Sequence, residues 1–337
     1  MKYTVLGNSG LIVSRLCLGT MIFGEKNKRG TDEGTAKQMV SRFIDLGGNF
    51  IDTADAYAAG VSEQIVGRAI KPYQRNQLVI ASKVRMPTGN GPNDAGLSRK
   101  HIIEGCEASL KRLGIETIDL YYLHMWDPVT PLEESLRALE DLIRQGKVRY
   151  IGVSNFRAWQ IMKALGVSDK LNMPRFIAGQ FQHSLIVRDI EREFTGLFLE
   201  ENIGEVVWGP LGGGFLSGKY KPGDKPEQGR IAVVPDHTEE AWHRRAVERN
   251  WRILETIGAI AENHGAQYAQ IALAWLLATP AVRSIIIGAR TTDQLEVNLG
   301  SLDIELSKEE LDTLNKVSSI TPGYPYRMID EYGKRTI

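Results

Sequence analysis

Short apolar runs alternate with longer amphipathic segments along most of this chain. The runs have the length of buried strands, and the segments between them carry apolar residues at helical spacing. We predict strands at residues 15–19, 49–53, 78–83, 118–123, 149–153, 176–181, 204–208 and 284–288. We predict helices between them, for example at residues 35–46, 62–70, 98–113 and 132–145. This alternation is typical of βα units around a parallel sheet.

The number of units favours a closed α/β barrel. Eight strands are predicted, and no linker rich in Pro, Gly or Ser divides the chain. We therefore expect one domain over residues 1–337, a (β/α)8 TIM barrel, with an open doubly wound sheet as the alternative. Residues 3–14 (YTVLGNSGLIVS) differ, because two short strands around Gly-Asn-Ser-Gly predict an N-terminal β-hairpin.

Two long segments interrupt the repeat. Residues 209–240 are rich in Gly, Pro and charge, and the tail from residue 319 is aromatic and irregular. Loops of this length in a compact domain are usually functional or disordered. We expect both segments to cover a binding site.

Composition excludes several classes of partner. The 41 basic and 41 acidic residues cancel, so no overall field favours nucleic acid or an anionic membrane. No segment approaches the ~18 uncharged apolar residues of a membrane span, and MKYTVLGNSG carries no signal sequence. Cys17 and Cys106 are too few for a disulfide scaffold. We predict a cytoplasmic protein with reduced cysteines.

Three predicted strands end in polar side chains that can transfer protons. Asp52, Lys83 and His124 end their apolar runs, and Tyr57 lies just beyond Asp52. Taken singly, each has a structural explanation: a helix cap, a solvated lysine, a satisfied core histidine and an aromatic residue at the rim. In a barrel, however, the carboxyl ends of the strands converge on one face, where polar residues are typical of catalysis.

Together these four side chains predict proton transfer to an oxygen. A buried lysine held by a carboxylate stays protonated and lowers the pKa of a neighbouring phenol. Such a tyrosine can protonate an oxygen as negative charge develops on it, and a nearby histidine can orient that oxygen. The cluster predicts carbonyl reduction or alcohol oxidation, which needs a hydride carrier.

Other strand ends could hold that carrier. Ser154, Asn155 and Gln180 can bond a carboxamide, and Trp208 can stack on a planar ring. The Gly-rich loop from Gly212 allows its backbone to approach phosphates. Arg290, at a strand-to-helix junction, also favours a phosphate.

Other nucleotide motifs are weak or absent. Gly213 to Lys219 (GGFLSGK) fits the first seven positions of a P-loop, but Tyr220 stands where Ser or Thr should bind magnesium. Neither G-x-G-x-x-G nor Y-x-x-x-K occurs, and the histidines have no metal-ligand spacing. A nucleotide hydrolase therefore remains only a minor alternative.

These residues resemble the aldo-keto reductase superfamily, from about Tyr3 to about Ser318. The segments that carry the resemblance are GGNFIDTADAYAAGVSEQIVGRAI, ASK, DLYYLHMWDP, GKVRYIGVSNF, GPLGGGFLSGKY and GARTTDQLEVNLG. The resemblance implies an NAD(P)H-dependent oxidoreductase on a (β/α)8 barrel. It implies that Tyr57 is the general acid/base, that Lys83 and Asp52 tune its pKa, and that His124 orients the carbonyl.

The resemblance also implies the cofactor contacts. These are Ser154, Asn155, Gln180, Trp208, Pro210, Leu211, Gly212, Gly214, Ser217, Lys219, Gly288, Arg290, Gln294 and Asn298. Two residues depart from the family pattern. At the position that stacks on the nicotinamide ring, Trp208 replaces the common Tyr, and the potassium-channel β-subunit branch also has Trp there. At the position that contacts the adenine, Val297 replaces a common Glu. Arg290 favours the 2′-phosphate of NADP(H), although NAD(H) is not excluded.

Apolar and aromatic side chains are expected at the barrel mouth. The candidates are Phe23, Met86, Met125, Trp126, Tyr324 and Tyr326. Of these, Phe23, Met86 and Trp126 are predicted to bind substrate, whereas the tail tyrosines could simply pack on the rim. An apolar rim suggests an uncharged or bulky carbonyl compound.

We expect a reversible aldehyde or ketone reductase with a small-molecule carbonyl or alcohol substrate. The alternative is a redox-sensing cofactor-binding protein of the channel β-subunit kind, with slow turnover. Against it, the sequence begins at the hairpin, so we expect no N-terminal extension. The sequence leaves the substrate, the direction of reaction and the oligomeric state open.

Overall fold

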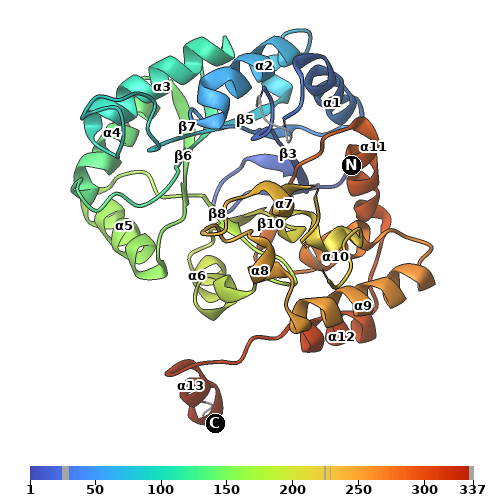
Figure 1. Cartoon of the computed structure of the whole chain (residues 1–337). Coiled ribbons are helices and arrows are strands. Elements are labelled where there is room, and N and C mark those ends of the chain that lie inside the picture. The colour runs from blue at the N-terminus through green and yellow to red at the C-terminus, as the bar shows by residue number, and fades with distance from the viewer. Residues whose placement is uncertain (25–29, 224, 228, 334–337) are drawn as a thin grey trace.

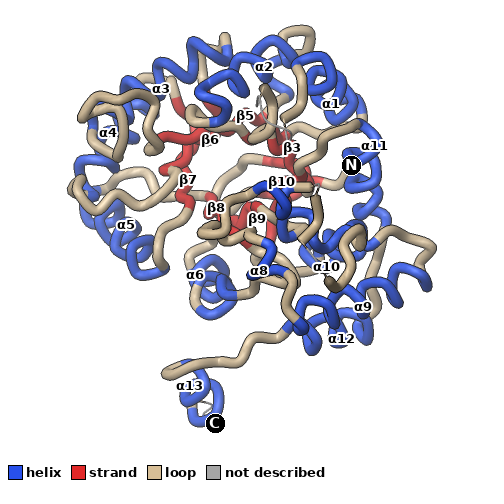
Figure 2. Tube along the Cα trace, viewed as in Figure 1, coloured by secondary structure: helices blue, strands red, loops and turns tan. Residues whose placement is uncertain are grey.

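The computed structural model describes residues 1–24, 30–223, 225–227 and 229–333. Eight parallel strands close into a barrel, shown as the central ring of Figure 2. They are β3 (Leu16–Gly19), β4 (Phe50–Asp52), β5 (Val79–Val84), β6 (Ile118–Leu123), β7 (Val148–Ser154), β8 (Ala178–Gln182), β9 (Gly204–Trp208) and β10 (Val282–Ile287). Because β10 pairs with β3, the predicted closed barrel is confirmed and the open sheet is wrong.

The predicted hairpin is also present. It consists of β1 (Tyr3–Val5) and β2 (Ile12–Ser14), which pair antiparallel. Leu6 and Val13 have no exposed surface and pack with side chains from the barrel interior. The hairpin therefore closes one end of the barrel with apolar side chains.

Helices surround the barrel (Figure 1). They are α1 (Glu33–Asp45), α2 (Val61–Ile70), α3 (Arg99–Leu113), α4 (Leu132–Arg144), α5 (Ala158–Leu171), α6 (Phe194–Glu200), α7 (Arg230–Val233), α8 (Trp242–Arg245), α9 (Glu248–Asn263), α10 (Tyr268–Leu277), α11 (Thr292–Leu299), α12 (Lys308–Ser318) and α13 (Tyr326–Tyr332). Within the described residues, no helix is both long enough and apolar enough to cross a membrane.

Alternation along the strands decides which side chains enter the barrel. Phe50, Val79 and Ala178 pack in the interior. Because side chains alternate between the two faces of a strand, Asp52 and Gln180 point to the same interior, each one step closer to the carboxyl end. The strands thus deliver polar side chains to the top of an apolar core.

The C-terminal tail differs from expectation. It was expected to be irregular, with its aromatic residues at the mouth, but it forms α13, which lies outside the helical ring beyond α6 (Figure 1). Tyr324 is 84% exposed, and Tyr326 donates a hydrogen bond to Glu193 at 2.7 Å. Neither tail tyrosine lines the mouth in this structure.

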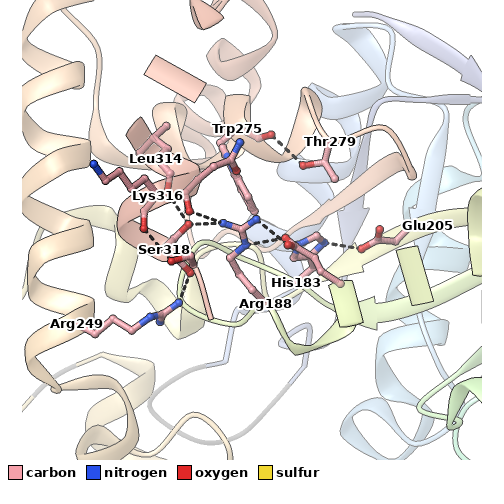
Figure 3. A network of polar contacts seen from close by, with 12 residues as sticks. His183, Arg188, Glu205, Arg249, Trp275, Thr279, Leu314, Lys316 and Ser318 are labelled. Atoms are coloured by element: carbon pink, nitrogen blue, oxygen red, sulfur yellow. Dashed lines mark hydrogen bonds and ion pairs between the residues drawn. The ribbon is translucent and has the colours of Figure 1, made fainter. Parts of the chain in front are cut away.

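A buried ionic network ties the barrel wall to the helices outside it (Figure 3). His183, directly after β8, lies 2.8 Å from Glu205 through Nδ1 and 2.9 Å from Glu191 through Nε2. Arg188 donates twice to Glu191 and once to Ser318 at the end of α12. Chain segments more than a hundred residues apart are therefore joined beneath the surface.

Candidate active site

Asp52 and Lys83 meet at the carboxyl ends of neighbouring strands. Lys83 Nζ donates to Asp52 Oδ1 at 2.5 Å, to the carbonyl oxygen of Thr53 at 2.8 Å and to Tyr57 Oη at 3.1 Å. Both charged side chains are almost completely buried. The structure thus brings three of the four predicted catalytic side chains into one hydrogen-bonded chain.

Burial and charge act in opposite directions on this chain. Burial lowers the pKa of Lys83, but Asp52 and Tyr57 outweigh it, so the lysine pKa lies above its usual value. For Asp52, burial raises the carboxyl pKa, and the charge of Lys83 opposes that rise. A protonated lysine paired with a carboxylate is consistent with these opposing effects.

The expected acidic phenol is not observed. Burial raises the pKa of Tyr57, and the lowering effect of Lys83 is too small to reverse that rise. The charge of Lys83 favours the phenolate, but the cost of placing a phenolate in a desolvated pocket is larger. In this structure Tyr57 is therefore a protonated hydrogen-bond donor at neutral pH.

His124, directly after β6, lies beside the tyrosine. The two ring centroids are 6.0 Å apart, in an edge-to-face arrangement. Burial, followed by the charges of Lys83 and Arg85, lowers the pKa of His124 to about 3. The imidazole is therefore neutral and can donate a hydrogen bond to an oxygen, but it is not the acid of this site.

The turn that carries Tyr57 has an unusual backbone. Ala58 (φ 48°), Ala59 (φ 53°) and Gly60 (φ 88°) are all left-handed, which is unfavourable for alanine. A Cβ on Gly60 would lie 2.7 Å from Arg112 Cδ of α3. The position of Tyr57 therefore depends on a strained turn packed against a helix, which the sequence analysis did not predict.

Asp55 was also missed. It lies between Asp52 and Tyr57, is 2% exposed, and neither carboxyl oxygen has a hydrogen-bond partner among the described residues. Burial and the nearby Glu63 raise the pKa of Asp55 to about 7. Nothing in the sequence pattern distinguishes this carboxylate from an ordinary polar loop residue.

The three predicted carboxamide ligands lie together at the ends of β7 and β8. Ser154 Oγ donates to the carbonyl oxygen of Gln180 at 2.7 Å, and Asn155 Nδ2 donates to that of His124 at 2.9 Å. Gln180 Nε2 donates to Asp52 Oδ2 at 2.7 Å. In this structure the amide nitrogen of Gln180 therefore helps to fix the carboxylate of Asp52.

Trp208 is the last residue of β9, and the Gly-rich turn follows it. Trp208 is partly exposed, and its Nε1 has no partner in the described part of the chain. Gly212, Gly213 and Gly214 have φ values of 57°, 72° and 89° within a 3₁₀ segment, Gly212–Ser217. Consecutive left-handed glycines expose backbone N–H groups and leave room for a phosphate.

Two cations near this turn fit an anionic cofactor. Lys219 Nζ lies 3.1 Å from the position of a Cβ on Gly214. Burial and the nearby charge of Arg290 lower the pKa of Lys219. Neither cation forms an ion pair with a carboxylate in the regions that the structure describes. Two neighbouring unpaired cations beside a glycine turn suit the phosphates of a dinucleotide.

The remaining predicted cofactor residues surround these cations. Gln294 Oε1 accepts from the backbone N–H of Arg290 at 2.9 Å and so orders the turn into α11. Ser217 Oγ donates to the carbonyl oxygen of Gly214 at 2.8 Å. Pro210 and Asn298 are buried, whereas Leu211 and Gly288 reach the surface.

The P-loop alternative is not supported. A P-loop requires a helix to begin at its Lys-Ser/Thr end. Here the residues after Lys219 are not helical as far as residue 223. The GGFLSGK segment is a 3₁₀ turn that ends at the left-handed Gly218.

The predicted substrate residues are placed differently from one another. Phe23 has no exposed surface and packs in the apolar core, so it presents no surface to a substrate in this structure. Its apolar side chain is explained by that packing. Met86 is partly exposed, and Trp126 packs edge-to-face on Phe156 with centroids 5.1 Å apart.

Comparisons with known proteins agree with this geometry. Residues 15–319 match the model of the "Aldo/keto reductase family". A "Probable voltage-gated potassium channel subunit beta" from Arabidopsis thaliana is 37% identical over 331 residues, covering 96% of this chain and 99% of that protein. An "Uncharacterized oxidoreductase YrpG" from Bacillus subtilis (strain 168) is 38% identical over 327 residues, covering 94% and 96%.

Proposed function

Because this chain belongs to the aldo/keto reductase family, we propose that it transfers a hydride reversibly between NADP(H) and a carbonyl or alcohol substrate. The observation that carries the proposal is the hydrogen-bonded chain from Asp52 through Lys83 to Tyr57, with a neutral His124 beside it. Carbonyl reduction requires one proton at the oxygen of the substrate, so that the product is a neutral alcohol. These groups can supply that proton.

The bound dinucleotide supplies the hydride that reaches the carbonyl carbon. Tyr57 Oη donates its proton to the carbonyl oxygen, which gives the alcohol. Lys83 stabilises the phenolate that remains, and Asp52 keeps the lysine protonated. A neutral His124 donates a hydrogen bond to the same oxygen and orients the carbonyl. Solvent then returns a proton to Tyr57, and alcohol oxidation follows the reverse course.

The cofactor preference in this proposal rests on Lys219 and Arg290. Their mutual repulsion is relieved when a phosphate binds between or beside them. An additional 2′-phosphate gives Arg290 a partner, so we propose NADP(H) as the preferred cofactor and NAD(H) as the weaker one. Trp208, partly exposed at the end of β9, is proposed to stack on the nicotinamide.

A redox-sensing role is the second candidate. The similarity to proteins named as potassium channel β-subunits favours it. On this alternative the chain would hold NADP(H) tightly and turn over slowly. We also propose a cytoplasmic location, supported by Cys17 and Cys106, which are both buried and unpaired.

Tyr57→Phe tests the proposal. NADPH consumption is measured over a panel of aldehydes and ketones, and cofactor affinity is measured by quenching of tryptophan fluorescence. We expect kcat to fall by about 10²–10⁴-fold, because the proton donor is lost, while NADPH affinity is retained.

Tyr73→Phe is the matched control, since its hydroxyl only approaches Asp45, at 3.4 Å, on the surface. Turnover that survives in Tyr57→Phe would contradict the assignment of Tyr57. Tight NADPH binding without turnover of any carbonyl compound would favour the redox sensor.

A further inference from the structure

Arg85 stands at the mouth of the barrel in an unusual backbone conformation. It lies directly after β5 and two residues beyond Lys83, with a φ of 140°. A side-chain-bearing residue in this region costs about 1–3 kcal/mol and persists only where its surroundings hold it. The carbonyl oxygen of Arg85 accepts from the N–H of Gly96 at 2.9 Å, which helps to fix the strained turn.

In the part of the chain that the structure describes, Arg85 is partly buried and forms no ion pair. Its Nε is buried and makes no hydrogen bond to any residue that the structure describes. Arg112 pairs with Glu63 at 2.6 Å and Arg75 with Asp119 at 2.5 Å, whereas Arg245 and Arg249 also have a buried N–H without a partner among the described residues. A buried guanidinium N–H without an acceptor is costly, so an acceptor from outside the described chain is expected.

Asp127, whose pKa is lowered in part by the charge of Arg85, does not supply the missing acceptor. Its charge interacts with that of Arg85, but the two form no ion pair. Asp127 Oδ2 accepts from the N–H of Leu97 and from Thr130 Oγ1, both at 2.7 Å, and Oδ1 accepts from the N–H of Val129 at 3.0 Å. Its acceptors are therefore engaged by neutral donors.

Arg85 lies at the same strand end as Lys83, two residues further along the chain. Its charge is one of the causes that lower the pKa of His124. The charge of a second arginine, Arg230 of α7, is one of the causes that oppose the rise of the Tyr57 pKa on burial, and α7 packs against the glycine turn Gly212–Ser217. Arg230 is paired with Glu240, whereas Arg85 has no ion pair within the described ranges. Positive charge thus flanks the proposed site of carbonyl binding.

We propose that Arg85 is a specificity-determining residue that binds an anionic group, a carboxylate or a phosphate, on the carbonyl substrate. The inference rests on the proposed function and names its substrate class. A guanidinium recognises either group through paired N–H donors and stays charged at every relevant pH. It differs from the expectation of an uncharged or bulky carbonyl compound, which was based only on the apolar side chains of the rim.

The test compares matched carbonyl pairs. Succinic semialdehyde is compared with butanal, and glyceraldehyde 3-phosphate with glyceraldehyde, using NADPH and the wild-type protein, Arg85→Met and Arg85→Lys. We expect the wild type to prefer one anionic member, and Arg85→Met to reduce that kcat/KM ratio by about 10–100-fold, mainly through KM. An effect of Arg85→Met on the succinic semialdehyde pair indicates a carboxylate ligand, and an effect on the glyceraldehyde 3-phosphate pair indicates a phosphate ligand. Arg85→Lys keeps part of the preference.

Arg99→Met is the matched control, because Arg99 already pairs with Asp141 at 2.6 Å on the surface. We expect this variant to keep the wild-type ratio. An equal ratio in Arg85→Met and the wild type would overturn the inference, since a purely structural arginine changes stability without changing discrimination. A wild-type preference for the neutral member of both pairs would also overturn the inference.

A binding measurement separates this inference from the proposed function. Calorimetric titration of succinate and of inorganic phosphate into the NADPH-loaded protein requires no turnover. Binding of either anion that weakens at least about tenfold in Arg85→Met and is unchanged in Arg99→Met supports the site, even if no aldehyde is reduced. Absence of Arg85-dependent binding of both anions would overturn it, even if aldehydes are reduced.

Discussion

At the scale of single residues, two carboxylates near Tyr57 have opposite surroundings. Asp52 accepts hydrogen bonds from Lys83 and from Gln180, so its charge is compensated in a buried place. Asp55, three positions later, is buried with no hydrogen-bond partner for either oxygen in the described residues. The hydrogen bonds of Asp52 stabilise its carboxylate next to the proposed proton donor. Burial without a partner destabilises the carboxylate of Asp55.

Replacing Asp55 by Asn should stabilise the protein in a pH-dependent way. The folded-state pKa of Asp55 is raised to about 7, above the unfolded value of about 3.9. The wild type therefore loses stability as the pH rises from about 4 to about 7, and Asp55→Asn does not. We expect the advantage of the variant to grow by up to about 4 kcal/mol over that interval, as measured by urea unfolding.

Asp312→Asn, on the exposed face of α12, controls for the loss of a carboxylate. An advantage of Asp55→Asn that does not grow with pH would contradict this account of the buried carboxyl group.

At the scale of elements, apolar runs and helical spacing predicted the barrel well. Buried parallel strands consist of continuous apolar residues, so their bounds could be read within about three residues. Strand ends also placed Asp52 and Lys83 correctly, because both follow the alternation of inner and outer side chains. The position of the proposed catalytic cluster at the strand ends was therefore predictable from local sequence.

Other elements depend on contacts that a local pattern does not contain. Ala58 and Ala59 favour right-handed helix by propensity, yet both are left-handed in the turn before Gly60, where an added Cβ would meet Arg112. Whether Arg85 Nε finds a hydrogen-bond acceptor depends on residues elsewhere in the chain, and so does the burial of Phe23. Such features require the folded structure.

The turn after Tyr57 gives an element-scale prediction. Gly60→Ala adds a Cβ at φ 88°, 2.7 Å from Arg112 Cδ. We expect the free energy of unfolding to fall by about 1–2 kcal/mol. We also expect kcat for aldehyde reduction to fall more than KM rises, because Tyr57 is displaced. Urea unfolding and steady-state kinetics measure the two effects.

Gly166→Ala in α5 is the matched control, since a Cβ there meets nothing within 4 Å. We expect this change to raise stability by about 0.5–1 kcal/mol and to leave kcat unchanged. If Gly60→Ala behaved in the same way, the strained turn would not be what positions the tyrosine.

At the scale of the whole molecule, the network of Figure 3 connects the barrel to its helices. Burial lowers the pKa of His183, but hydrogen bonds to Glu191 and Glu205 raise it to about 9 overall. A charged histidine between two carboxylates therefore holds β8, β9 and the segment after β8 together at neutral pH.

His183→Leu should destabilise the protein and change its pH dependence. Loss of the imidazolium leaves the buried carboxylate of Glu205 without its charged partner, which costs about 3–5 kcal/mol near pH 7. Because the folded-state pKa is raised above the unfolded value of about 6.5, the stabilisation is complete below about pH 6.5 and is lost as the pH rises through about 9. Urea unfolding should therefore show a smaller deficit near pH 10.

His264→Leu provides the comparison, because His264 pairs with Glu310 at 2.9 Å in a more exposed place. We expect that variant to lose less than about 1 kcal/mol. Equal losses in the two variants, or a deficit of His183→Leu that is constant with pH, would contradict the role of the buried network.

The central claim, hydride transfer with Tyr57 as the proton donor, is tested most directly by isotope transfer in a single turnover. The protein is loaded with NADPH deuterated at the transferable position of the nicotinamide and mixed with an aldehyde that the wild type reduces. We predict one deuterium on the carbinol carbon of the product with the wild type, and almost none in the same time with Tyr57→Phe carrying the same NADPH. Equal labelling by Tyr57→Phe, or NADPH oxidation that leaves the alcohol carbon unlabelled, would contradict the claim.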